Sequence, residues 1–289
     1  MRWSFRLGRV NGVPVEIHWL FALLVLWSAG EGWSRGRVAG LLYSSGLLLA
    51  VFGCILLHEI GHSLQAQALG IAVRRIVVMP FGGLAQLAHI PERPRDELRV
   101  AAAGPVVNLA LALLAGGPLL VILPAAAPGL PLSAAFRQII LRAEPGPAHF
   151  LTYLALINAG LVVFNLLPAF PLDGGRIARS LLALVIPREL ATRMVAGLGW
   201  TLGIACVLLG LAVVRGWGTA ASVSLTFIGL TALLGTGAEE MFERGHIALQ
   251  GIPVRAAVSP SHRFPGDLAD QEKTPSQHLP GRGSSCCCC

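Results

Sequence analysis

Residues 38–62 read VAGLLYSSGLLLAVFGCILLHEIGH, and this stretch decides the fold. Its first twenty residues carry no charged side chain, which is enough to cross the hydrocarbon of a bilayer as a helix. Histidines four residues apart on a helix project from one face, so His58 and His62 can hold one metal ion with Glu59 beside them. A hydrolytic metal site in the membrane is therefore the hypothesis to be tested against the rest of the sequence.

The composition of the chain agrees with a membrane setting. Of its 289 residues 54% are hydrophobic and 13% charged, and the mean hydropathy is +0.68. Such values are typical of a multi-pass membrane protein, whose partner is the lipid bilayer. The net charge of +7 does not indicate nucleic-acid binding, because the arginines are scattered between apolar runs and form no stripe with interleaved aromatics.

Stretches without Asp, Glu, Lys or Arg predict the membrane spans. They lie at residues 17–30, 38–57, 100–136, 145–172, 194–214 and 216–238. The third is too long for one span and is broken by prolines, which predicts a helix near 100–123 followed by a loop. The fold class is therefore an all-α polytopic membrane protein with about six transmembrane helices. The first stretch is short, and a cleaved signal peptide is the alternative interpretation of it.

Basic residues predict the orientation in the membrane. Six spans place both termini on one side, and that side carries 17 basic residues against five on the other. The positive-inside rule then predicts that both termini are cytoplasmic, in a cell inner or plasma membrane. The His58 end of the second span lies on the same side, so the active site is expected toward the cytoplasm.

A small β-hairpin is predicted between the second and third spans. Residues 71–79 and 84–87 are rich in β-branched and apolar side chains, and Pro-Phe-Gly-Gly at 80–83 supplies a turn. Strand edges cannot face lipid, so the hairpin must be buried in protein or face a water-filled cavity. A free edge there can pair with an extended substrate by strand addition, and a re-entrant structural loop is the equally weighted alternative.

A catalytic zinc site needs a third protein ligand, and Asp173 is the candidate. It follows 28 uncharged residues, and Pro168 and Pro171 unwind the helix just before it. An acidic group at such a depth costs roughly 2.5–3.5 kcal/mol, so a partner is expected. A metal ion is the partner that best offsets this cost, and an ion pair with Arg176 is the alternative.

The other candidate ligands are weaker. Several carboxylates are set aside because they fall in predicted loops: Glu31, Glu92, Asp96, Glu97, Glu144 and Glu189. Cys54 lies one turn before His58, yet a thiol in an apolar helix is usually a small buried hydrophobe. The histidines near span ends, which have no partner four residues away, are interpreted as structural: His18, His89 and His149.

These motifs together resemble those of the site-2 protease family of intramembrane zinc metalloproteases. The resemblance rests on HEIGH at 58–62, on residues 165–176 with their Leu-Asp-Gly-Gly core, and on Gly-Pro-Val-Val-Asn at 104–108. It covers about residues 1–250, and the motifs are specific. It implies a zinc endopeptidase that cleaves a transmembrane segment near the cytoplasmic face.

The resemblance also implies roles for individual residues. One zinc ion per chain would be held by His58, His62 and Asp173, with Glu59 as the general base that takes a proton from the attacking water. The chemistry of an H-E-x-x-H site leads independently to the same base. The implied substrates are membrane-anchored regulators such as anti-sigma factors.

Two asparagines are candidates for positioning the substrate. Asn108 and Asn165 can hydrogen-bond the substrate backbone, or they can bridge helices through amide contacts. A substrate helix must unwind before cleavage, because its carbonyls are occupied by intrahelical hydrogen bonds. Helix-breaking residues in the substrate are therefore expected to favour cleavage.

The C-terminal region departs from the family pattern. A transmembrane metalloprotease domain is predicted at 1–242, and 243–289 is interpreted as a cytoplasmic lead-in followed by a disordered tail. Residues 243–255 resemble the lead-in to cystathionine-β-synthase-type domains, but the residues after them are too polar to bury a core. Cys286–Cys289 admit lipidation, metal binding or a truncated or frame-shifted regulatory domain, and we prefer the last.

Two further functions compete with proteolysis. A catalytically silent membrane scaffold or binding protein would keep the fold, but this chain retains the base and all three candidate ligands. A metal transporter would use His58, His62 and Asp173 as a transit site. It is disfavoured because the predicted spans offer no further ionisable residues for a conduction path.

Overall fold

The computed structural model describes residues 4–79, 82–89, 91, 93–126, 129, 131, 134, 146–213 and 219–249. The chain divides into two units, Met1–Glu243 and Arg244–Cys289, and of the second unit only the residues that end the last helix are described. The predicted disordered tail and the terminal cysteines lie outside the described residues. The account below concerns the first unit.

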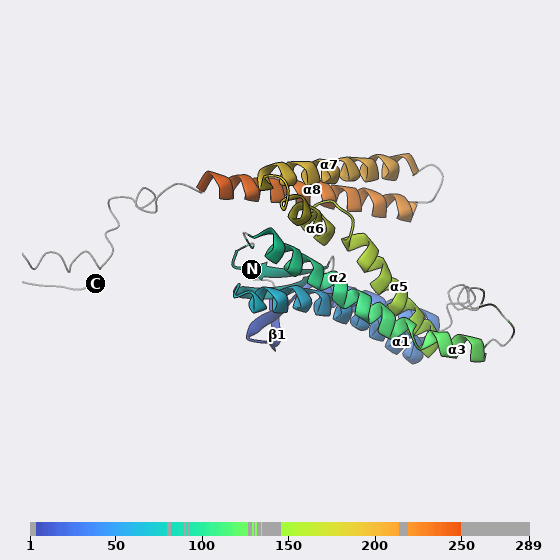
Figure 1. Ribbon diagram of the computed structural model, residues 1–289. Coiled ribbons are helices and arrows are strands. Elements are labelled where there is room, and N and C mark those ends of the chain that lie inside the picture. The colour runs from blue at the N-terminus through green and yellow to red at the C-terminus, as the bar shows by residue number, and fades with distance from the viewer. Residues whose placement is uncertain are drawn as a thin grey trace, which may run out of the picture. The chain divides into compact units, whose positions relative to one another are not determined.

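Helices make up most of this unit, with four strands near its N-terminus (Figure 1). The helices are α1 (Leu20–Ala68), α2 (Pro94–Gly116), α3 (Leu119–Ala126), α5 (Pro147–Asn165), α6 (Asp173–Leu182), α7 (Arg188–Val213) and α8 (Thr219–Leu249). The strands are β1 (Ser4–Val10), β2 (Val13–His18), β3 (Val73–Met79) and β4 (Gly82–Leu87).

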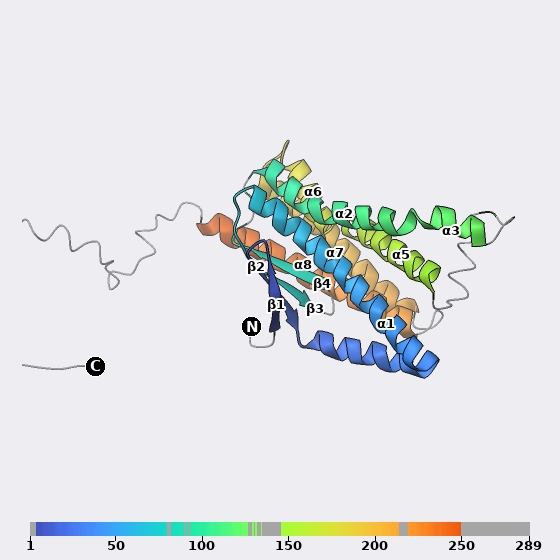
Figure 2. The same ribbon diagram turned by 90° about the horizontal axis from the view of Figure 1, so that it is seen from below.

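Within the described residues, five helices are long and apolar enough to cross a membrane, and the first of them is divided. Within α1 the backbone leaves helical geometry at Gly36 and Arg37, so the chain turns back on itself, as Figure 2 shows. The two segments approach closely, since a Cβ on Gly32 would lie 2.8 Å from the carbonyl carbon of Gly40. Counting both segments confirms the prediction of about six membrane helices.

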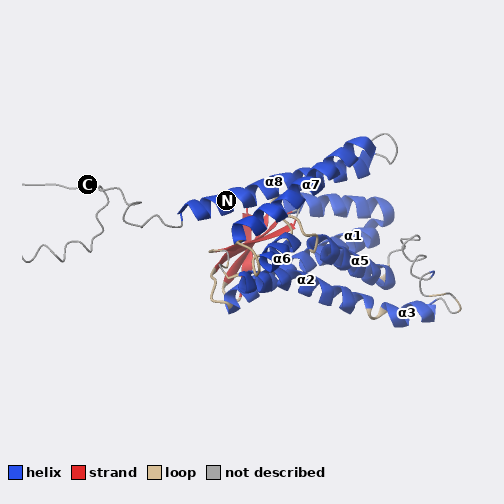
Figure 3. Ribbon diagram, turned by 45° about the horizontal axis from the view of Figure 1, so that its top comes forward, coloured by secondary structure: helices blue, strands red, loops and turns tan. Residues whose placement is uncertain are grey.

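The strands form one sheet in the order β1-β2-β3-β4, drawn in red in Figure 3. The predicted hairpin is confirmed as β3 and β4. The hairpin of β1 and β2 was missed, and the prediction that a span begins at residue 17 is wrong, because β2 continues to His18. The missed signal is Asn11-Gly12, where both residues have positive φ (48° and 81°) as a type I′ hairpin turn requires.

The sheet packs against α1 through a small apolar core. Val13, Val15 and Ile76 are buried, and Leu56 and Ile60 of α1 pack against them. Leu56 and Ile60 bracket the first histidine of the HEIGH motif on the same helix. The sheet is therefore fixed to the part of α1 that carries the candidate metal ligands.

A polar ladder crosses all four strands. Ser4 of β1 donates to Glu16 of β2 at 2.7 Å, Arg75 of β3 lies 3.2 Å from the same carboxylate, and Arg75 also donates to Gln86 of β4 at 2.8 Å. The hydrogen bond from Ser4 lowers the pKa of Glu16, burial opposes this effect, and Arg75 adds to the lowering. The ladder joins each strand to its neighbour, so it ties the outer strand β4 to the rest of the sheet.

The chain between α5 and α6 is irregular, as the two prolines predict. Helix α5 ends at Asn165, residues 166–172 are non-helical, and α6 begins at Asp173. The segment is anchored by Phe170, which is fully buried and whose carbonyl accepts a hydrogen bond from Thr236 of α8 at 2.9 Å. The helix break thus delivers Asp173 to the first turn of a short helix of ten residues.

Candidate metal centre

The structure brings His58, His62 and Asp173 together from two helices. The Nε2 atoms of the two histidines lie 3.1 Å apart. The Oδ2 atom of Asp173 lies 3.2 Å from Nε2 of His58 and 3.3 Å from Nε2 of His62. Both imidazoles are largely buried in α1, whereas the aspartate comes from the start of α6. Among the described residues this is the one group of three side chains placed to hold a metal ion.

These separations fit a tetrahedral zinc ion. Zinc–nitrogen and zinc–oxygen bonds of about 2.05 Å at tetrahedral angles place neighbouring ligand atoms about 3.3 Å apart. The three measured separations, 3.1, 3.2 and 3.3 Å, agree with that value. Two imidazoles and one carboxylate leave the fourth position to water or substrate, as in a catalytic rather than a structural zinc site.

The orientation of His62 is fixed by its other ring nitrogen. Nδ1 of His62 lies 2.7 Å from the carbonyl oxygen of Val100 in α2, so it acts as the donor and leaves Nε2 unprotonated. Nδ1 of His58 has no partner within the described part of the chain. Helix α2 therefore sets the tautomer of one of the two histidines.

The alternative interpretation of the sequence was an ion pair between Asp173 and Arg176. The structure does not form this pair. The guanidinium of Arg176 lies 2.6 Å from the carboxylate of Glu239 in α8 and so turns toward that helix. The carboxylate of Asp173 faces the two imidazoles instead. Arg176 therefore pairs with Glu239 of α8, and the carboxylate of Asp173 is available to bind a metal ion.

Close approach of α2 to the two imidazoles requires Gly104. A Cβ at this position would lie 2.6 Å from Cε1 of His58 and would also collide with the ring of His62. Real Cβ atoms essentially never approach another heavy atom so closely. The glycine of the Gly-Pro-Val-Val-Asn motif thus makes room for the two histidines that are candidate metal ligands.

Glu59 lies against the outer strand β4. Its Oε2 atom accepts a hydrogen bond from the backbone N–H of Ala85 at 3.0 Å, and a Cβ on Gly83 would lie 2.8 Å from its Cδ atom. β4 pairs with β3 on its other side and is the last strand of the sheet. No other described strand pairs with the outer side of β4, so the candidate base lies directly beside an edge of the sheet that is free among the described residues.

The remaining predicted residues lie outside the metal cluster. Asn108 is 1% exposed, and neither atom of its amide finds a partner within the described ranges; Asn165 is partly exposed at the end of α5. The thiol of Cys54 accepts a hydrogen bond from Asn158 of α5 at 3.3 Å. Cys54 is thus engaged in packing α1 against α5.

Sequence reasoning missed one charged residue near the centre. Glu97 was set aside as a loop carboxylate, but it lies in the first turn of α2 and is only 2% exposed. The available signal was helical spacing, because Glu97, Ala101, Gly104 and Asn108 recur at intervals of four, three and four residues along one face. All four are buried in α2.

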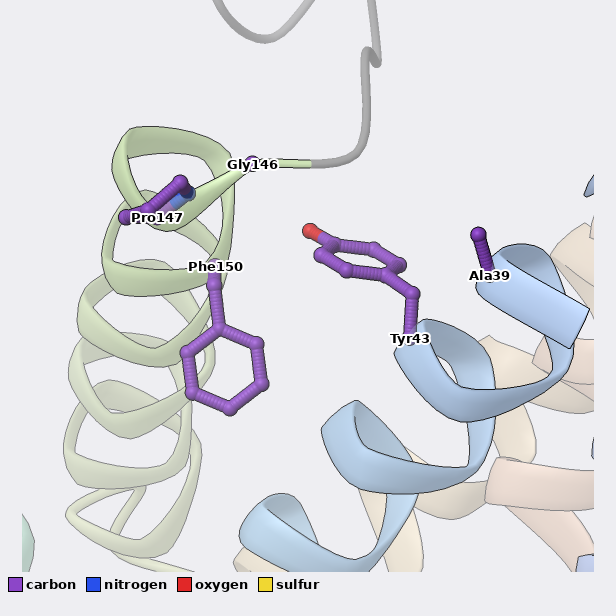
Figure 4. A pocket seen from close by; sticks show the side chains of 5 residues that line it. All are labelled: Ala39, Tyr43, Gly146, Pro147 and Phe150. Carbon is purple, nitrogen blue, oxygen red and sulfur yellow. The ribbon is translucent and has the colours of Figure 1, made fainter.

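A pocket of about 410 Å³ lies far from this centre, between α1 and α5 (Figure 4). It is lined by Ala39, Tyr43, Gly146, Pro147 and Phe150. Tyr43 precedes His58 by 15 residues, which is roughly 22 Å along a helix. The pocket is mainly apolar and does not extend the metal cluster.

Comparison with known proteins identifies the same region of the chain. The model of the family described as Peptidase family M50 matches residues 46–210. This range includes the three residues of the cluster and the candidate base Glu59. A zinc metalloprotease of Methanocaldococcus jannaschii is 31% identical over 73% of this chain and 55% of its own length. Zinc metalloprotease Rip3 of Mycobacterium tuberculosis is 29% identical over 92% of this chain and 66% of its own length.

A solved structure shares the fold. The site-2 protease from Methanocaldococcus jannaschii superimposes with a TM-score of 0.52 at 28% identity, covering 82% of this chain and 95% of that one. The chain spans 55% and 66% of the two relatives named above. The chain therefore matches only part of the length of these relatives.

Proposed function

Because this chain belongs to peptidase family M50, we propose that it is an intramembrane zinc endopeptidase. It hydrolyses peptide bonds within or near the transmembrane segments of membrane-anchored proteins. The observation that carries this proposal is the cluster of three ligand atoms at tetrahedral spacing beside Glu59. The relatives named as zinc metalloproteases support the choice of zinc.

His58, His62 and Asp173 would hold the zinc ion, which when bound would supply Lewis acidity toward the scissile carbonyl and toward water. Glu59 takes the proton from the attacking water and delivers it to the leaving amine. The N–H of Ala85 holds one oxygen of this carboxylate, so the other oxygen is left for proton transfer.

The sheet edge supports a mode of substrate binding. A transmembrane helix must unwind before its carbonyls can be attacked, and an unwound segment has free backbone donors and acceptors. Strand β4 offers a free edge next to Glu59, where an extended segment can be held by backbone hydrogen bonds. Asn108, whose amide is buried without a partner among the described residues, supports a further contact to the substrate backbone, and Asn165 is proposed for the same role.

Orientation and organisation complete the proposal. The distribution of basic residues supports cytoplasmic termini and an active site toward the cytoplasm, within an inner or plasma membrane. Residues 1–242 constitute the protease domain and 243–289 a cytoplasmic extension. Membrane-anchored regulators of the anti-sigma type are the proposed substrates.

The test is a comparison of wild-type protein with Glu59→Gln in detergent or vesicles, using single-span peptides as substrates. Glutamine keeps the size and the acceptor for Ala85 but cannot take a proton, so cleavage should fall by at least about 100-fold while zinc content is unchanged. Glu189→Gln removes an exposed carboxylate and is the matched control. Undiminished cleavage by Glu59→Gln would refute the mechanism, and zinc flux without cleavage would favour a transporter.

A further inference from the structure

A second group of charges lies close to the metal centre and has no part in the chemistry described so far. Arg179 of α6 is fully buried and donates two hydrogen bonds to Oε1 of Glu97 in α2, the one from Nε at 3.1 Å. Arg188, at the start of α7, lies 3.0 Å from the other oxygen of Glu97. The guanidinium of Arg179 also stacks over the ring of Phe170, 5.0 Å from its centre.

Stability alone is a poor explanation of this buried ion pair. Removing two charges from water costs about as much as their attraction returns, and well-packed apolar side chains often replace such pairs without loss. What this arginine–carboxylate pair provides is a fixed geometry, since two donors of one planar guanidinium bind the same oxygen of Glu97 and so set both distance and orientation. The pair is therefore suited to holding two helices at one spacing.

The two helices that it joins meet again at the metal centre. Gly104 lies seven residues after Glu97 on α2, about 10.5 Å along the helix, and touches the imidazoles of His58 and His62. Asp173 lies six residues before Arg179 on α6, about 9 Å along that helix, and faces the same imidazoles. These similar lengths place the ion pair one to two helical turns from the cluster on both helices.

Asp173 needs support from other elements because the backbone that leads to it is not part of a long helix. The two histidines share α1, whose backbone sets their spacing, whereas Asp173 belongs to a ten-residue helix that follows the irregular residues 166–172. Gly175 allows α6 to pack tightly on this segment, since a Cβ there would lie 2.8 Å from the amide nitrogen of Phe170. Phe170 is in turn covered by Arg179.

We propose that Glu97 and Arg179 are positioning residues that hold Asp173 at ligand distance from His58 and His62 by fixing α6 against α2. The inference rests on the proposed role of these three residues as zinc ligands. The pair touches neither substrate nor metal and acts only through the placement of α6. It is called the α2–α6 clamp below.

Zinc affinity and ligand geometry test the clamp. Three variants are compared with wild type: Glu97→Gln, Glu97→Asp and Arg179→Lys. Zinc dissociation constants are measured by chelator competition, and the visible spectrum of the cobalt-substituted protein reports coordination geometry. We expect each variant to weaken zinc binding at least tenfold, the size of effect seen when residues that support metal ligands are changed.

Glu97→Asp separates placement from charge. It keeps the negative charge and shortens the side chain by one methylene, about 1.5 Å, so α6 must shift or the pair must break. A role in charge balance alone predicts unchanged zinc affinity in this variant, and that result would overturn the proposal. Arg179→Lys keeps the positive charge but loses the fork of donors, and it carries the test if Glu97→Gln does not fold.

A destabilised control excludes a general loss of structure. Phe21→Ala removes a buried ring that packs against Phe52, away from α6, and should lower the melting temperature without weakening zinc binding. If the clamp variants melt early but bind zinc as Phe21→Ala does, the clamp is refuted. If wild type binds no zinc, or Asp173→Asn binds it as tightly as wild type, the proposed ligand set fails instead.

Discussion

Replacing Gly104 with alanine adds a single methyl group at the point where α2 meets the metal ligands. In most helices this change is favourable, by up to about 1 kcal/mol, because glycine is the poorer helix former. Here the new Cβ would lie 2.6 Å from Cε1 of His58 and would also collide with His62. The substitution should therefore favour the helix itself but disturb the two histidines of the site.

The size of the displacement follows from that distance. Carbon atoms in contact prefer a separation of about 3.5 Å or more, so His58 or α2 must move by about 1 Å. Helix α2 has little freedom to retreat, since α5 packs against it and Glu97 ties it to α6. Metal–ligand distances tolerate only about 0.2 Å, so we expect zinc affinity to fall at least about 100-fold.

The assay measures zinc content, zinc affinity and cleavage of a single-span peptide in Gly104→Ala and in Gly116→Ala. Gly116 lies on the same helix, but a Cβ there would sit 3.6 Å from Cβ of Ala155, an ordinary contact. Gly116→Ala should keep both zinc and activity. If Gly104→Ala binds zinc and cleaves as well as this control, the close approach of α2 to the imidazoles is not needed, and the proposed architecture of the site is wrong.

Other perturbations test the base, the metal and the sheet. Gly83→Ala should push the carboxylate of Glu59 aside, because the new Cβ would lie 2.8 Å from Cδ; kcat should fall at least tenfold with zinc content unchanged, and equal kcat would exclude this contact. Removing zinc with a strong chelator should abolish cleavage and lower the melting temperature, and added zinc should restore both, because a ligand of the native state stabilises it. The pKa of Glu16 is lowered in the fold, by Ser4 first and also by Arg75. The stability that Glu16 contributes is present above its unfolded pKa of about 4.3 and is lost as pH falls through the lower folded value. Melting curves below pH 4.5 should therefore decline more steeply for wild type than for Glu16→Gln, and parallel declines would contradict this.

The three residues of the metal cluster could be found in the sequence because each breaks a local rule. His58 and His62 are polar residues at helical spacing in an otherwise apolar span, and Asp173 is a charge at the end of 28 uncharged residues. Such exceptions are costly in a membrane, so each one indicates a partner. The second and fourth predicted spans run in the same direction, so their C-terminal ends, which carry His58 and Asp173, are expected at the same membrane face without any knowledge of side-chain packing.

The clamp and the first hairpin were missed for a different reason. Glu97 lies among the charged residues that precede a span, where a carboxylate needs no special explanation, and its helical spacing from Ala101 and Gly104 was not used to place it on the buried face. β1 and β2 carry a clear Asn-Gly turn, but the basic residues of β1 agree equally with a membrane-flanking segment. In both cases the composition of the segment fitted a simpler structure than the one that forms.

Helix α2 contributes no ligand and no base, yet three of its residues touch different parts of the centre. The carbonyl of Val100 orients His62, the missing side chain of Gly104 admits both imidazoles, and Glu97 binds the arginine of the helix that carries Asp173. They lie three to four residues apart, so one face of one helix contacts both imidazoles and the helix that carries Asp173. A rotation or shift of α2 would therefore disturb all three candidate ligands at once. Substitutions on this face of α2 should abolish zinc binding even though His58, His62 and Asp173 are unchanged.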